Sequence, residues 1–299
     1  FALQPIPVIM VSALTQRSAD VTLQALDRGA MDYVAKPESA AAIESCIKEE
    51  LLHKIRIVAG ADVQRVLRIR QERAARATKA APPVAVQSTI AAPAGYENAC
   101  LALGISTGGP PALSTLFQSL QLPLPGIVIV QHMPAQFTSA FARRLDSLSP
   151  VHVKEASTGD QLKPNCAYIA PGGKHLHLQR RGARTYLHVR DGDPVSGHRP
   201  SADVMMQSAA KLYGERCLGI IMTGMGSDGA QGCADIRAAG GYVLGQDEAT
   251  SDVYGLNKVA FVNGHVDRQF PLETLPELIT RRCRNFSDSQ LVQPTVAAH

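Results

Sequence analysis

The chain has 299 residues, of which 45% are hydrophobic and 19% are charged, a mixture typical of globular proteins and long enough for two domains. Its formal net charge is only +4, with acidic and basic residues interspersed, so we expect no nucleic-acid partner. No apolar run approaches the roughly 20 residues that span a bilayer, which predicts that the protein does not insert into a membrane.

The six cysteines are scattered along the chain, with no CxxC pair and no spacing typical of a zinc site. Because most of them lie in apolar surroundings, we interpret them as buried, reduced thiols of a cytoplasmic protein. The chain begins mid-pattern with "FALQPIPVIM" and without an initiator methionine. We therefore expect no signal peptide, and we expect the start of a longer protein to be missing.

Residues 1–73 carry two short apolar runs that predict strands, "PVIMVSA" (7–13) and "AMDYVAKP" (30–37). Between them, residues 18–29 predict a helix that begins with Ser18 as its cap. The rest of this region has helical periodicity over several turns. Two strands do not complete a parallel sheet, so we expect apolar edges such as the first run to be exposed.

Residues 74–97 are rich in alanine and proline and have little periodicity, which predicts an interdomain linker. Residues 98–285 form one dense domain by their pattern, and we expect residues 286–299 to be a disordered tail. The sequence therefore predicts two structured regions joined by a linker.

Buried strands alternate with helices in residues 98–285, which predicts a doubly wound, mostly parallel sheet of the α/β class. The predicted strands are 99–105, 126–131, 166–170, 217–224 and 241–246, and the predicted helices are 111–120, 138–148, 201–213 and 229–240. Residues 173–193 alternate like an antiparallel hairpin, which we expect as an addition at the edge of the sheet.

Three of these strands end in residues that carry chemistry. Ser106 follows the first strand in "GISTGG", His132 follows the second in "QHMP", and Asp228 follows the fourth in "MGSDG". Because the carboxyl ends of parallel strands meet at one edge of a sheet, we expect these side chains to lie close together. A hydroxyl, an imidazole and a carboxylate have the composition of a nucleophile, its base and the acid that orients the base.

The stretch "GISTG" also fits G-x-S-x-G, in which a sharp turn lifts a serine hydroxyl out of the sheet. The chain order Ser, His, Asp differs from the Ser, Asp, His order of α/β-hydrolases, which argues against a standard member of that fold. A convergent triad on another α/β sheet remains open.

Other interpretations of these residues are structural. Ser106 has the position of a helix N-cap, and Asp228 has a similar position before the helix that follows it. A dinucleotide-binding GxGxxG motif would need glycine at position 106, and "TGMGSDG" lacks the Lys-Ser/Thr of a phosphate-binding loop. The residues alone leave the triad and the helix caps as alternatives.

Further polar positions carry weaker signals. His175 and His177 share one face of a strand, but no third ligand is evident, so we expect no metal site there. Arg199 lies on a loop before a helix that Ser201 caps, and it faces either an acidic partner or solvent.

Six blocks of the sequence resemble, in order, the signature blocks of the chemotaxis protein-glutamate methylesterases, the CheB family. They are "GISTGGPPAL", "QHMPAQFTSAFARRL", "YIAPGGKHL", "GHRPSADV", "MTGMGSDGAQG" and "QDEATS". The resemblance covers essentially all of residues 98–280. It implies a cytoplasmic serine hydrolase that removes methyl esters from glutamate side chains of chemoreceptors and, in some members, deamidates receptor glutamines.

The resemblance also implies roles for individual residues. Ser106 would be the nucleophile, His132 the general base and acid, and Asp228 its orienting partner. The backbone N–H of Met225 would help to form the oxyanion hole, and Thr107 would shape the same pocket. The esterase reaction of the family implies no cofactor. The partners implied are methyl-accepting chemotaxis receptors, so the protein would lie at receptor clusters.

Residues 1–73 resemble the end of the family's flavodoxin-like receiver domain. Ser12 would match its switch hydroxyl and Lys36 its phosphate-contacting lysine, whereas the acidic pair and the phosphoacceptor aspartate would precede residue 1. Magnesium and a chemotaxis histidine kinase as phosphodonor would therefore be needed only by an intact receiver. One further departure is Asn257, which replaces the family's usual proline in "YGLNK" and bears on specificity more than on catalysis.

Two other functions remain as alternatives. In the first alternative, the hydrolase domain serves only as a regulated binding module. Release of methanol from methylated receptor would distinguish an esterase from such a module. The second is a DNA-binding response regulator, which the sequence does not support because it lacks a helix-turn-helix pattern and a basic face.

Overall fold

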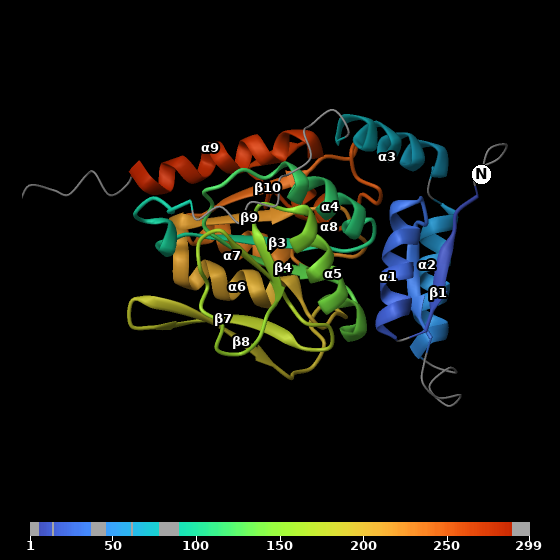
Figure 1. Cartoon of the computed structure of the whole chain (residues 1–299), viewed down its shortest axis with the longest axis horizontal. Helices are drawn as coiled ribbons and strands as arrows, with labels where there is room; N and C mark the ends of the chain where they lie inside the picture. Colours follow the sequence, from blue (N-terminus) through green and yellow to red (C-terminus); the bar gives the residue numbers. More distant parts are fainter. Residues whose placement is uncertain (1–5, 14, 37–45, 61, 78–89, 289–299) are drawn as a thin grey trace, which may run out of the picture.

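The computed structural model describes residues 6–13, 15–36, 46–60, 62–77 and 90–288. Two parts are visible in Figure 1, a smaller N-terminal region and a larger α/β domain that follows it. The predicted linker and the predicted tail lie in part outside the described residues.

Seven parallel strands form the central sheet of the larger domain, as far as residues 90–288 are described. In their order across the sheet they are β11 (Arg268–Phe270), β10 (Tyr242–Gln246), β9 (Cys217–Ile221), β3 (Cys100–Ile105), β4 (Gly126–Gln131), β6 (Cys166–Ile169) and β5 (His152–Glu155). The predicted α/β class with a mostly parallel sheet is confirmed. The short strands β5 and β11 were not predicted, because neither is a continuous apolar run.

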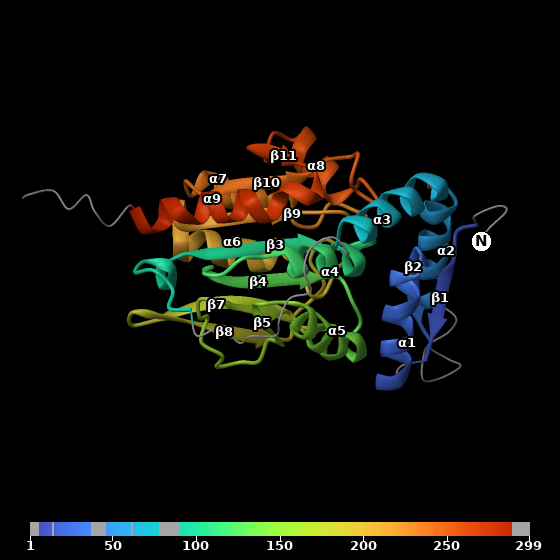
Figure 2. The same cartoon turned by 45° about the horizontal axis from the view of Figure 1, so that its top comes forward.

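Helices cover both faces of this sheet (Figure 2). One face is covered by α4 (Gly109–Ser119), α5 (Ala135–Leu148) and α9 (Leu275–Asp288), and the other by α6 (Ala202–Tyr213), α7 (Ala230–Ala238) and α8 (Leu256–Val262). The side chains of β3 alternate between the two cores, with Leu101 and Leu103 in one and Ala102 in the other. This alternation on a doubly buried strand explains why β3 is apolar throughout.

The antiparallel hairpin of β7 (His175–Arg181) and β8 (Arg184–Arg190) is a two-stranded sheet of its own. The prediction that it extends the edge of the main sheet was wrong. Its apolar side chains Leu176, Leu178 and Leu187 are buried in the core that α6 also lines. The hairpin therefore packs by one face on a helix layer and needs no hydrogen bonds to an edge strand.

Within the described part of residues 6–77, the N-terminal region has two parallel strands and three helices. They are β1 (Ile9–Ser12), α1 (Gln16–Asp27), β2 (Asp32–Ala35), α2 (Cys46–Ala59) and α3 (Val63–Ala77). The first helix begins before the predicted Ser18, because the Thr15 side chain accepts a hydrogen bond from the Ser18 N–H at 3.2 Å and caps it. The third helix extends beyond residue 73, the predicted end of this region.

The two parts share a core. Leu23 and Leu26 of α1 lie in the same buried cluster as Phe137 and Phe141 of α5. The other side of the N-terminal region is open: Val11 of β1 is 49% exposed, as expected for a strand whose sheet is incomplete. The region is thus attached to the larger domain through α1.

The C-terminal helix α9 continues to Asp288, past residue 285, where the sequence predicted the domain to end. Phe286 is buried in the core cluster, and its carbonyl accepts a hydrogen bond from Arg216 at 2.5 Å. The residues that were predicted to begin a disordered tail therefore continue a packed helix. Residues 289–299 lie outside the described part of the chain.

Candidate active site

Ser106 lies immediately after β3, in a turn that glycines make possible. The backbone of Gly108 has φ +77°, a left-handed conformation that side chains other than glycine rarely adopt. A Cβ atom on Gly224 would lie 2.6 Å from the Cβ of Ser106, so only glycine lets the loop after β9 approach the serine. The Ser106 N–H donates to the Thr223 carbonyl at 3.0 Å. The serine is thereby held at the carboxyl edge of the sheet.

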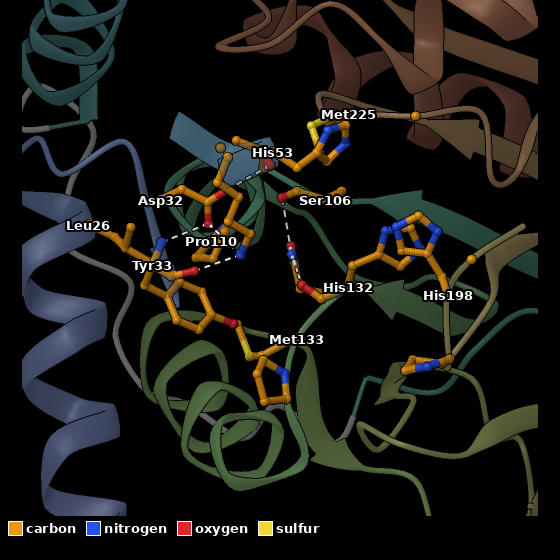
Figure 3. Close-up of a pocket in the computed structure, with 18 of the residues that line it drawn as sticks. Leu26, Asp32, Tyr33, His53, Ser106, Pro110, His132, Met133, His198 and Met225 are labelled. Carbon is orange, nitrogen blue, oxygen red and sulfur yellow. Dashed lines mark hydrogen bonds and ion pairs between the residues drawn. The ribbon is translucent and has the colours of Figure 1, made fainter. Parts of the chain in front are cut away.

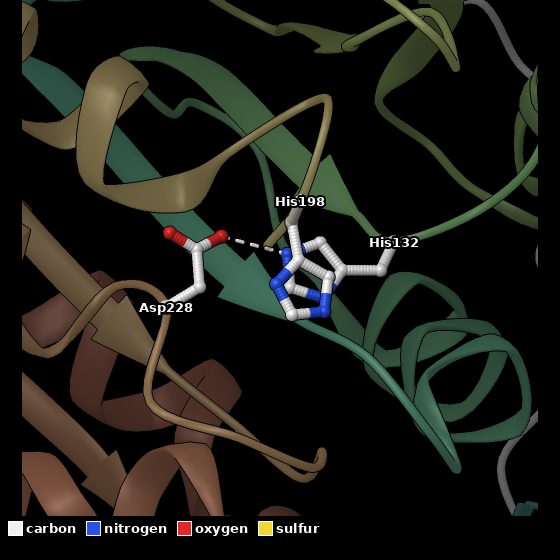
Figure 4. A group of neighbouring side chains, drawn as sticks. All are labelled: His132, His198 and Asp228. Carbon is white, nitrogen blue, oxygen red and sulfur yellow. Dashed lines mark hydrogen bonds and ion pairs between the residues drawn. The ribbon is translucent and has the colours of Figure 1, made fainter. Parts of the chain in front are cut away.

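His132 and Asp228 form a close pair at the same edge. His132 follows β4, and its Nε2 lies 2.7 Å from Oδ2 of Asp228 in the loop after β9 (Figure 4). The other ring nitrogen, Nδ1, is buried and has no hydrogen-bond partner among the described residues. Nδ1 is therefore the nitrogen that remains to accept a proton from a substrate or a nucleophile.

Asp228 is fully buried and saturated with hydrogen bonds. Its Oδ1 accepts from Ser201 Oγ at 2.6 Å and from the Asp203 N–H at 3.1 Å, and its Oδ2 accepts from the Ala202 N–H at 2.6 Å. These backbone donors are the first N–H groups of α6, whose dipole also favours an anion there. Burial alone raises the pKa of Asp228, but the bonds from His132, Ser201 and Ala202 outweigh burial and lower the pKa to about 2.

A pocket of about 670 Å³ opens at this edge, and Ser106, His132, His198 and Met225 line it (Figure 3). Among the described residues, neither the Ser106 hydroxyl nor the Met225 N–H makes a hydrogen bond. Both groups are thus available to a ligand in the pocket. Ser106 and His132 lie in the same cavity without a mutual hydrogen bond, which is common in active sites without substrate.

Residues of the N-terminal region line the other side of the pocket (Figure 3). Asp32 Oδ2 accepts a hydrogen bond from the Thr107 hydroxyl at 2.8 Å, next to Ser106. Lys54 Nζ donates to the Tyr33 carbonyl at 2.6 Å and lies 3.4 Å from Asp32 Oδ1. The predicted pocket residue Thr107 therefore contacts the N-terminal region as well as the pocket.

A buried ion pair also joins the two regions. Nε of Arg70 in α3 donates to Oδ2 of Asp252 at 2.9 Å, and Nη2 of Arg70 lies 2.7 Å from the same oxygen. Nη1 of Arg70 donates to the carbonyls of Leu26 and Ala30 at 2.9 Å. Asp252 follows β10 at the carboxyl edge of the sheet. Because both charges are almost fully buried, removing one of them would leave the other unpaired in the interior.

His198 was not among the predicted site residues. Its ring stacks on that of His132, with centroids 3.8 Å apart and an interplanar angle of 12°. Burial, followed by the nearby His132, lowers the pKa of His198 below its usual value. The signal that would have identified it is its place in the "GHRPSADV" block, directly before the loop residues Arg199 and Ser201.

The remaining predicted positions are placed as follows. Arg199 lines the pocket and is partly tied to the loop, because its Nη1 donates to the Gly192 carbonyl at 2.6 Å. Asn257 is fully buried in α8, where its amide donates to the Gln246 carbonyl at 2.7 Å and to Ser251 Oγ at 2.8 Å. Asn257 thus connects α8 to the end of β10.

Ser12 and Lys36 lie at the ends of β1 and β2 and are apart from the pocket lining. The Ser12 hydroxyl accepts from Thr22 Oγ1 at 2.8 Å, and the Ser12 carbonyl accepts from the Lys36 N–H at 2.7 Å. The Lys36 side chain is exposed. The backbones of the two residues are therefore adjacent.

His175 and His177 are not part of a potential metal-ligand cluster among the described residues. His175 is buried, with Nε2 at 2.9 Å from the Asp193 carbonyl and Nδ1 accepting from the Ser201 N–H at 3.3 Å, so both nitrogens are in use. The potential metal-ligand cluster found among the described residues is His132, His198 and Asp228.

Comparison with known proteins relates the larger domain to one family. The sequence model of the family described as "CheB methylesterase" matches residues 101–279. None of the described helices is both long and apolar enough to cross a bilayer. The chain is 41% identical over 288 residues to protein-glutamate methylesterase/protein-glutamine glutaminase 2 of Chromobacterium violaceum, a match that covers 94% of this chain and 80% of the relative.

Two further similarities agree with this result. The chain is 42% identical to protein-glutamate methylesterase/protein-glutamine glutaminase of Pyrococcus abyssi, over 93% of this chain and 73% of the relative. The crystal structure of the CheB methylesterase catalytic domain of Thermotoga maritima superposes with a TM-score of 0.60 at 36% identity, covering 61% of this chain and 97% of that chain.

Proposed function

The chain belongs to the CheB methylesterase family, and we propose that Ser106, His132 and Asp228 are the triad with which it hydrolyses glutamate methyl esters of chemoreceptors. The chain is a protein-glutamate methylesterase and protein-glutamine glutaminase of the chemotaxis pathway. The observation that carries the residue assignment is the buried His132–Asp228 pair, which lies at the same sheet edge as the unbonded Ser106 hydroxyl.

In the proposed reaction, the Ser106 hydroxyl attacks the ester carbonyl while Nδ1 of His132 takes its proton. Asp228 keeps the Nε2 proton of His132 in place and stabilises the imidazolium that forms, because its carboxylate stays ionised well below neutral pH. The unbonded N–H of Met225 is available to the oxyanion.

The leaving group then takes the proton from His132 and departs as methanol. A water molecule, activated by His132 in the same way, hydrolyses the Ser106 ester and restores the enzyme. With a glutamine substrate the same steps release ammonia instead of methanol. The mechanism uses the side chains of this chain and, as proposed, no cofactor.

The test of this function is the release of both products from receptor membranes. Incubation of the chain with methylated receptor membranes is expected to release methanol, and receptors that carry glutamine at the same positions are expected to release ammonia. A chain that binds the membranes and releases neither product would be a binding module. The same substrate would place the protein in the cytoplasm at receptor clusters, and co-sedimentation with receptor membranes checks this placement.

Arg199 is expected to contact the receptor and not the reacting ester. It lies on the pocket rim in a loop and is not bonded to the triad. Arg199→Ala should therefore weaken methanol release from receptor membranes more than hydrolysis of a small activated ester. Arg184→Ala, an exposed arginine at the end of the hairpin, is the matched control. Equal losses on both substrates would show that Arg199 has a general structural role.

We also propose that residues 6–77 are the end of a receiver domain, with the chemotaxis histidine kinase as phosphodonor of the intact protein. Their β1-α1-β2 arrangement and the adjacency of Ser12 and Lys36 support this assignment. Magnesium would be bound only by the acidic residues of an intact receiver.

Cutting the linker near Pro82 and removing the N-terminal fragment is expected to raise the rate on receptor membranes, because Asp32 and Tyr33 line the pocket from the N-terminal region. The rate on small activated esters should rise less. An unchanged or lower rate on receptor membranes after the removal would contradict the prediction.

A further inference from the structure

His198 brings a third metal-binding side chain to the His132–Asp228 pair. One ring nitrogen of each histidine and one carboxylate oxygen of Asp228 all lie within 4.8 Å of one another (Figure 4). Two imidazoles and one carboxylate are a donor set that binds zinc in proteins, with a water molecule as the fourth ligand. The proposed hydrolysis assigns no role to His198, so this cluster is larger than the triad requires.

The rings of His132 and His198 are stacked, with centroids 3.8 Å apart and an interplanar angle of 12°, so the His198 ring must turn out of the stack before both rings can direct a lone pair at one ion. The surrounding groups already fix the tautomer of His198 and the position of Asp228. His198 Nδ1 lies 2.8 Å from the Ser196 carbonyl and therefore carries the hydrogen, which leaves the Nε2 lone pair free. A histidine that binds a metal usually donates its other N–H to a carbonyl in this way. Asp228 is fixed by Ser201 and the first turn of α6, so its Oδ2 has one orientation.

The site also has room for a metal and an entry path. His132 and His198 both line the pocket of about 670 Å³, which provides space for a water molecule as the fourth ligand. In a tetrahedral zinc site the ligand atoms lie about 3.4 Å apart, given metal–ligand bonds of about 2.1 Å. Nε2 of His132 and Oδ2 of Asp228, at 2.7 Å, must separate slightly, and the His198 ring must turn toward them from its stacked position.

We propose that His132, His198 and Asp228 form an inhibitory binding site for a divalent transition-metal ion of the zinc type, which overlaps the proposed triad. Nε2 of His132 would bind the metal in place of its proton. That proton moves to Nδ1, so the ring stays neutral and no proton is lost from it. Nδ1 then has no lone pair with which to take the Ser106 proton. The metal and the nucleophile thus compete for one imidazole.

The first test measures binding directly and does not depend on activity. Titration of the chain with zinc chloride in a calorimeter is expected to show one site per chain, and His198→Gln should weaken it by at least about tenfold. The control is His152→Gln, because His152 pairs with Asp146 at 2.9 Å on the surface and belongs to no potential metal-ligand cluster among the described residues. Absence of saturable binding, or equal affinity in wild type and His198→Gln, would overturn the proposal.

A second measurement on the unaltered chain keeps the proposal testable if His198→Gln does not fold. Cobalt(II) added to the chain should give the intense visible absorption of a four-coordinate ion, whereas the weak spectrum of an octahedral ion would refute the site. Magnesium should not compete, because it prefers six oxygen ligands.

The inhibitory part rests on the proposed function and is tested separately. Zinc should stop hydrolysis of a small activated ester over the concentration range in which it binds, and a chelator should restore the rate. If zinc binds but the metal-free chain hydrolyses no ester, the result would count against the proposed function alone. Full activity with zinc bound would count against the inhibitory site alone.

Discussion

Ser106→Ala and His132→Ala are each expected to lower kcat for ester hydrolysis by several orders of magnitude. The two residues act as one unit, because the hydroxyl is a poor nucleophile without a base and the imidazole has no nucleophile to activate without the hydroxyl. The double variant should therefore be about as slow as either single variant. Steady-state kinetics of the three variants on a small activated ester measure this non-additivity.

Ser119→Ala is the matched control for the serine, because Ser119 is an exposed residue of α4 outside the pocket. It should retain the wild-type rate. Circular dichroism would establish that each slow variant is folded. Losses that multiply in the double variant would mean that Ser106 and His132 contribute independently, which contradicts a shared proton transfer.

Asp228→Asn is expected to have the second largest effect, a loss of about 10²- to 10⁴-fold in kcat. The carboxylate accepts four hydrogen bonds, from His132, Ser201 and the backbone of Ala202 and Asp203. An amide has one accepting oxygen, so its NH₂ group would face donors. It would also favour a His132 ring with the hydrogen on Nδ1, which is the wrong tautomer for a base. The rate of the variant on the same small ester measures the effect.

The stability of this variant gives an independent check. The pKa of Asp228 is about 2 in the folded chain against 3.8 for an ordinary aspartate, so the group contributes stability above pH 3.8 and loses it as the pH falls through 2. Urea unfolding should therefore show a larger deficit of Asp228→Asn against wild type at pH 7 than at pH 3. A deficit that is the same at both values would mean that the charge of Asp228 is not stabilised in the fold.

The residues of the site were predictable to the extent that they lie at strand ends. Ser106, His132 and Asp228 follow apolar runs that predicted parallel strands, and the structure brings all three residues to one edge of the sheet. Their supports were not predictable. Ser201 was interpreted as a helix cap, and it also holds Asp228 across 27 positions of sequence. Long-range hydrogen bonds of this kind leave no local pattern.

The same limit applies to the fold. The long buried strands β3, β4 and β9 were predicted from continuous apolar runs, whereas β5 and β11 are short strands without such a run. The hairpin was identified by its alternation, but periodicity does not indicate which layer its apolar face covers. The contact of Asp32 with Thr107 joins residues 75 positions apart, so the N-terminal wall of the pocket emerged only from the structure.

The most direct test of the central claim is the rate of methanol release from methylated receptor membranes by the chain and by Ser106→Ala, measured at equal binding to the membranes. The account predicts that the variant binds the receptor normally and releases methanol several orders of magnitude more slowly. Near-normal release by a folded, receptor-bound Ser106→Ala chain would contradict the assignment of Ser106 as the nucleophile.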